Sequence, residues 1–153
     1  MSRTYGLKSA RDLLAKLERD AAQLREEVSS DRFFNFVVTA YSLADWIERD
    51  PSVPAAAKAS LQTFRGKVEI QTCRDLANAS KHFELDKKKS PSPTVAKADS
   101  EEGFGVGRSG VGGYGVGEEE ITVTLTAGNV VNGLDVMEGA VRAWKQFFSA
   151  HSM

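Results

Sequence analysis

The side chains best suited to chemistry lie between residues 67 and 82. Asp75, Asn78 and His82 have i, i+3, i+7 spacing, which places a carboxylate, an amide and an imidazole on one side of an α-helix. An imidazole can transfer a proton at one ring nitrogen while a neighbour fixes the tautomer at the other. Arg74 and Lys81 add positive charge that could hold a phosphate. The pattern predicts either a catalytic site for phosphodiester chemistry or simply the solvated face of a helix.

The helix that carries these residues is predicted to run from about Val68 to Phe83. Its polar stripe also includes Lys67 and Gln71. The opposite side is predicted to face the core, with Cys73 and Ala77 adjoining it, and consists of Val68, Leu76, Ala79 and Phe83.

A second helix is predicted from a cap at Ser30 or Asp31 to about Arg49, where Pro51 stops it. Apolar residues, Trp46 among them, cover most of its circumference, which is typical of a helix in the middle of a bundle. One polar strip remains, formed by Asn35, Thr39, Ser42, Asp45 and Arg49. If this strip faces the stripe of the 68–83 helix, Asp45 and Arg49 form a binding cleft with Lys81 and His82. If it faces solvent, the cleft has no second wall.

Three further helices complete the expected bundle. One begins with Ser9 as N-cap and runs to about Val28 along a narrow apolar seam of Ala10, Leu14, Leu17, Ala21, Leu24 and Val28. A shorter one starts at Pro54 and ends near Phe64. The last runs from about 133 to 150 with a core seam of Leu134, Met137, Val141, Trp144 and Phe148. Short connections favour antiparallel neighbours.

Residues 86–117 have a composition rich in Lys, Pro and Gly, which predicts a long flexible loop. The letters of a dinucleotide motif occur at 105–110, but the flanking sequence has no strand and helix to support that reading. Phe104 and Tyr114 near Arg108 could stack on nucleic acid, although a flexible tether is the simpler interpretation. Residues 118–131 predict a β element, whose strand must pair with 130–131, a piece of the loop, or a second subunit.

Composition restricts the protein class. The 153 residues, 41% hydrophobic and 27% charged, fit a single globular domain spanning 1–153. A net charge of −1 argues against a protein built mainly to bind a phosphate backbone. Cys73 is the one cysteine, and His82 and His151 are the only histidines, so we expect no disulfide, no metal site and no cofactor. We find no signal-like or membrane-spanning apolar run, and therefore expect a cytoplasmic protein without a membrane partner.

Two segments carry a resemblance to known proteins. Residues 40–47 (AYSLADWI) and 73–83 (CRDLANASKHF) resemble a group of uncharacterised bacterial and phage proteins, and the likeness extends over most of the chain. More distantly, Arg74-Asp75 followed by His82 is similar to the signature of the HEPN superfamily of helical bundles. In that family Arg, a polar neighbour and His serve metal-independent RNA cleavage, and the separation between Arg and His is shorter than here.

The sequence therefore predicts a mainly α-helical antiparallel bundle of four to five helices with a small β element and a long glycine-rich loop. Two functions follow. The favoured one is a non-catalytic module that self-associates or binds a protein partner, through the seam of the first helix or the free edge of the strand. The alternative is a HEPN-like ribonuclease, a toxin or defence effector acting on RNA through Arg74, Asp75, Asn78 and His82.

Overall fold

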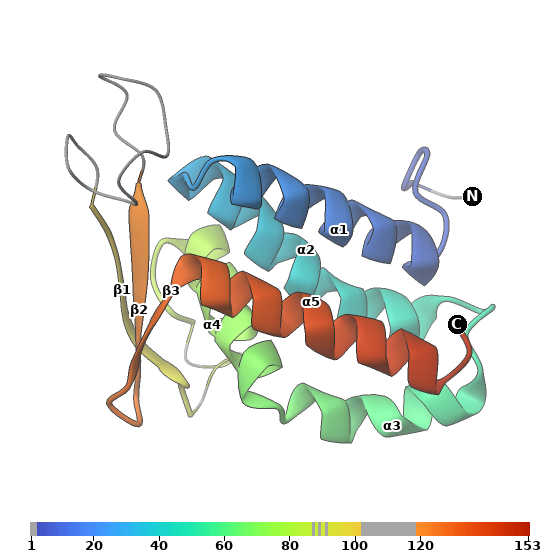
Figure 1. Ribbon diagram of the computed structural model, residues 1–153. Helices are drawn as coiled ribbons and strands as arrows, with labels where there is room; N and C mark the ends of the chain where they lie inside the picture. The colour runs from blue at the N-terminus through green and yellow to red at the C-terminus, as the bar shows by residue number, and fades with distance from the viewer. Residues whose placement is uncertain (1–2, 87, 89, 91, 102–118) are drawn as a thin grey trace.

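The computed structural model describes residues 3–86, 88, 90, 92–101 and 119–153, which form five helices and a small antiparallel sheet at one end of the helices (Figure 1). The 86–117 segment and the 105–110 glycine motif, with Phe104, Arg108 and Tyr114, fall largely or wholly outside these residues. The elements are α1 (Ala10–Glu26), α2 (Ser30–Arg49), α3 (Ala55–Arg65), α4 (Val68–His82), β1 (Val95–Glu101), β2 (Glu120–Leu125), β3 (Val130–Asn132) and α5 (Gly133–Ala150).

Helix α2 packs against each of the other four helices, which confirms its predicted central place. Its start differs by one residue from the prediction, because the Ser29 hydroxyl accepts a hydrogen bond from the N–H of Arg32 at 3.1 Å. The cap is therefore Ser29 rather than Ser30 or Asp31. The cap of α1 is Ser9 as predicted, with Asp12 completing a capping box.

The innermost tryptophan is Trp144 of α5, which is fully buried. Its indole N–H donates to the carbonyl of Ala40 on α2 at 3.0 Å, and its ring lies 4.6 Å from that of Phe64 on α3. Trp46 is only half-buried, so its predicted place in the interior of the bundle is wrong. A helix that is apolar on nearly every side gives no signal for which aromatic side faces inward.

The sheet has the strand order β1-β2-β3. Strand β3 is the predicted partner 130–131 extended by one residue, and the turn before it uses Gly128 at φ +104°, a conformation that side chains disfavour. Strand β1 lies inside the stretch predicted to be a flexible loop, so that prediction is wrong for residues 95–101. The helical and β parts meet at Gly133, where an added Cβ would stand 3.0 Å from the Cβ of Ile121.

Glu119 joins the sheet to the start of α2. Its carboxylate accepts hydrogen bonds from the Ser100 hydroxyl at 2.6 Å, from the Ser30 N–H at 3.0 Å and from the Ser30 hydroxyl. Hydrogen bonds from Ser100 and Ser30 hold the pKa of this carboxyl below its usual value, and partial burial opposes them. The side chain of Glu119, the residue just before β2, thus connects β1 to the first turn of α2.

Candidate functional site

Asp75, the predicted carboxylate of the site, is buried and hydrogen-bonded to the main chain. One oxygen accepts from the N–H groups of Thr94 and Val95 at 2.6 and 3.0 Å, and the other from Arg74 at 2.9 Å. Only 1% of its surface is exposed. The carboxylate therefore anchors the start of β1 to α4, and its acceptor positions are already in use.

Asn78 has a similar role one turn further along α4. Its amide nitrogen donates to the Asp86 carbonyl at 3.0 Å and to the Ser90 hydroxyl at 3.1 Å, and its oxygen accepts from the N–H of Asp86. Together with Asp75 and Gln71, which accepts from the Thr94 hydroxyl, it holds the connection from α4 to β1. The predicted stripe is thus partly covered by the chain itself rather than by water or a ligand.

Lys81 and His82, unlike Arg74, make no hydrogen bond or ion pair with Asp75 or Asn78 among the described residues. Lys81 and His82 are exposed in the last turn of α4. The helix ends at its C-cap Phe83, which has φ +68° and is 95% exposed. Arg74 pairs with Asp75 and also reaches the carbonyl of Ser92 at 3.4 Å. The predicted core face of this helix is also wrong at both ends, because Val68 is half exposed and Phe83 is almost fully exposed.

The predicted second wall lies elsewhere. Asp45 pairs with Arg65 of α3 at 3.4 Å, and Arg49 lines a hollow of about 390 Å³ beside the N-terminal segment. Asp45 and Trp46 line the same hollow, but Lys81 and His82 do not. The structure therefore brings the predicted binding residues Asp45 and Arg49 together and separates them from Lys81, so the predicted cleft with α4 is wrong.

Part of the polar strip of α2 faces α1. The Thr39 hydroxyl donates to Asp20 at 2.7 Å and receives a hydrogen bond from Lys16, which also pairs with Asp20 at 2.6 Å. Thr39 is buried, so this network satisfies a polar group that would otherwise be costly inside the bundle.

Cys73 has no nucleophilic character. It is fully buried, and burial raises the pKa of its thiol to about 12, with a smaller contribution from Glu69. A thiol with that pKa remains protonated at neutral pH, and it is the thiolate that reacts. Among the described residues, no three His, Cys, Asp or Glu side chains form a cluster that could hold a metal ion.

The outer edge of β1 is an exposed feature of the described fold. Six of its seven residues are exposed, and among the described segments only β2 pairs with it. Lys97 and Asp99 lie opposite Thr124 and Thr122 of β2, on the sheet face away from the buried Ile121 and Val123. They form an ion pair with each other at 2.8 Å.

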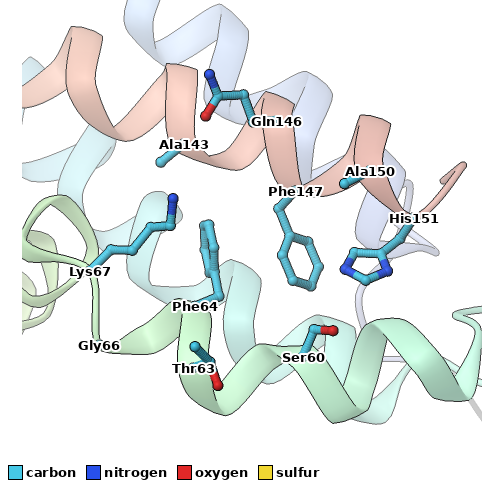
Figure 2. A pocket seen from close by; sticks show the side chains of 10 residues that line it. All are labelled: Ser60, Thr63, Phe64, Gly66, Lys67, Ala143, Gln146, Phe147, Ala150 and His151. Carbon is cyan, nitrogen blue, oxygen red and sulfur yellow. The ribbon is translucent and has the colours of Figure 1, made fainter.

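A groove between α3 and α5 has no counterpart in the sequence-based predictions. It encloses about 680 Å³ and places the rings of Phe64, Phe147 and His151 in a row, with Lys67 at one end (Figure 2). In the sequence, Phe64 marks only the end of a predicted helix, and Phe147 lies outside the predicted core seam of 133–150. The i, i+4, i+7 spacing of Ala143, Phe147 and Ala150 places them on one helical face, but it does not show that a groove lies there.

Comparison with family models, curated proteins and solved structures gave no match to this chain. Of the described helices, none combines the length and the apolar character needed to cross a membrane.

Proposed function

We propose that the chain is a non-catalytic module that self-associates, or binds a protein partner, through the edge of β1 that no other described strand pairs with. The observation that supports this proposal is the order of charges on that exposed edge: Lys97, Ala98, Asp99. An edge strand presents unpaired N–H and C=O groups that a further strand can satisfy. The charges of Lys97 and Asp99 determine which strand can pair with this edge.

A second copy of the chain fits in one particular register. When two β1 strands pair antiparallel about Ala98, Lys97 of each copy lies opposite Asp99 of the other. Cross-strand pairs of opposite charge contribute roughly 0.2–1 kcal/mol each, and the symmetry of the dimer provides two of them. Ala98 meets Ala98 at the centre, where small side chains allow close approach. The result would be one continuous antiparallel sheet across both copies.

The same charges disfavour indiscriminate pairing. A strand shifted by two residues would place Lys97 opposite Lys97 in one direction, or Asp99 opposite Asp99 with Lys97 facing Glu101 in the other, and like charges directly across a sheet are destabilising. Charged edge residues commonly protect sheets against aggregation. The edge of β1 is therefore selective for a strand with the complementary pattern, which its own sequence provides.

The roles of Asp75 and Asn78 favour this function over catalysis. Both side chains are buried and bonded to the segment that leads into β1, so they position the edge strand. The alternative, a HEPN-like metal-independent ribonuclease or defence effector, would depend on Arg74, Lys81 and His82, because Asp75 is already bonded to Arg74, Thr94 and Val95.

The proposal is tested by molar mass as a function of concentration for the full chain. Lys97→Asp and Asp99→Lys should each weaken dimerisation at least about tenfold, because each places like charges across the interface twice. The double variant Lys97→Asp/Asp99→Lys should restore it. Lys145→Asp, an exposed position on α5, is the matched control and should leave the dimer unchanged. A monomer at all concentrations, or single variants that dimerise like the wild type, would contradict the proposal.

A further inference from the structure

We propose that the groove between α3 and α5 binds a planar aromatic ligand that carries a carboxylate. This site is independent of the edge of β1: it is built from α3, residue 67 and the second half of α5, away from the sheet (Figure 1). Its volume of about 680 Å³ lies within the usual range for small-molecule sites, roughly 300–1,000 Å³.

The floor of the groove is aromatic. The rings of Phe64 and Phe147 have centroids 4.7 Å apart and are tilted by 48°, and the His151 ring lies 4.7 Å from Phe147. Small residues flank them, since α5 contributes Ala143 and Ala150 to the walls. Phe64 and Phe147 are themselves only 6% and 5% exposed, so a flat ligand ring would contact their outer edges, an edge-to-face arrangement that aromatic groups favour.

One end of the groove is positively charged. Lys67 extends into the space between the helices (Figure 2), with its ammonium 5.8 Å from the centroid of the Phe64 ring. No acidic side chain lines the groove, and Lys67 has no carboxylate partner among the described residues. The nearby Glu69 lines a separate hollow with Val68 and Thr72. A ligand carboxylate would supply the missing counter-charge through a charge-assisted hydrogen bond.

Polar residues also line the groove. Thr63 and Gln146 come from opposite helices, and Figure 2 shows their side chains directed away from the rings of Phe64 and Phe147. Ser60 already donates its hydroxyl hydrogen to the carbonyl of Ala56 at 3.1 Å, so towards a ligand it can only accept. A carboxylate at Lys67 would thus place the ring over Phe64 and Phe147, with its far end towards His151.

The probe for this site is 2-naphthoate, titrated into the ¹⁵N-labelled full chain and followed by NMR. We expect saturable shifts in the amides of Lys67, Gln146 and His151. The neutral analogue 2-naphthalenemethanol and the non-aromatic anion cyclohexanecarboxylate should each bind at least about tenfold more weakly, because each lacks one of the two features that the groove matches.

Two variants complete the test. Lys67→Gln should weaken naphthoate binding about tenfold, the factor that corresponds to 1.4 kcal/mol, while Lys145→Gln outside the groove should have no effect. Ala150→Trp, at an exposed position, should fill the groove and abolish binding without disturbing the core. Equal binding of the neutral analogue, shifts located elsewhere, unchanged affinity in Lys67→Gln, or no binding at all would overturn the proposal. Because β1 is not involved, Lys97→Asp should bind naphthoate normally.

Discussion

Replacing Asp75 by alanine tests whether this carboxylate anchors the start of β1 to α4 or is only part of a polar helix surface. The substitution leaves the N–H groups of Thr94 and Val95 without their acceptor and removes the ion-pair partner of Arg74. Each buried donor without a partner costs about 1–3 kcal/mol. Because Thr94 and Val95 are only half-buried, we expect a total loss of about 2–4 kcal/mol in the free energy of unfolding.

Urea denaturation followed by circular dichroism measures this loss, and hydrogen exchange locates it. The amides of Thr94 and Val95 should be protected in the wild type and should exchange rapidly in Asp75→Ala. Asp75→Asn keeps an acceptor oxygen and should lie between the two. The control is Asp45→Ala, an exposed carboxylate whose ion pair with Arg65 should be worth about 1 kcal/mol or less. A loss below about 1 kcal/mol in Asp75→Ala with unchanged protection would refute the anchoring role.

Three further outcomes are expected. Trp144→Ala should cost about 3–5 kcal/mol because its site is fully buried, and Trp46→Ala clearly less; equal losses in urea denaturation would place both indoles at the same depth. The lowered pKa of Glu119 contributes stability that is present above the unfolded pKa of about 4.3 and is lost as the pH falls through the folded pKa. Glu119→Gln should therefore flatten the dependence of the unfolding free energy on pH between about pH 5 and 3. Parallel pH profiles for the variant and the wild type would be inconsistent with this link. Single-stranded RNA should remain intact when incubated with the chain and a chelator, and His82→Ala should change stability by no more than about 0.5 kcal/mol; cleavage that His82→Ala abolishes would establish the ribonuclease alternative.

The helices could be predicted because their signals are local. Ser9 caps α1, Pro54 precedes α3, and the apolar spacing of 133–150 gives α5 its buried seam. These signals depend only on residues within a few turns of one another. Strand β1 could not be predicted in the same way, because residues 95–101 have no bulky apolar residue after Val95 and are ordered through long-range partners, β2 and Asp75.

The candidate site could be predicted only in part, for a related reason. A helical wheel places Asp75 and Asn78 on one polar face, and it places them there correctly. It does not indicate whether water, a ligand or a later part of the chain covers that face. Here Asp86, Ser90, Thr94 and Val95 cover it, so two polar residues that could serve a catalytic site instead bind a later part of the chain. The groove of Lys67 and Phe147 likewise depends on the approach of two helices that are distant in sequence.

The most direct test of self-association through β1 is to mix the two single charge variants. Lys97→Asp and Asp99→Lys should each be mainly monomeric at a concentration where the wild type is dimeric. In an equimolar mixture, both cross-strand pairs of the antiparallel register become complementary, so sedimentation velocity should show a heterodimer with about the affinity of the wild-type dimer. A mixture that stays monomeric while the wild type dimerises would show that Lys97 and Asp99 do not face each other across an interface, and the proposed register of β1 would be wrong.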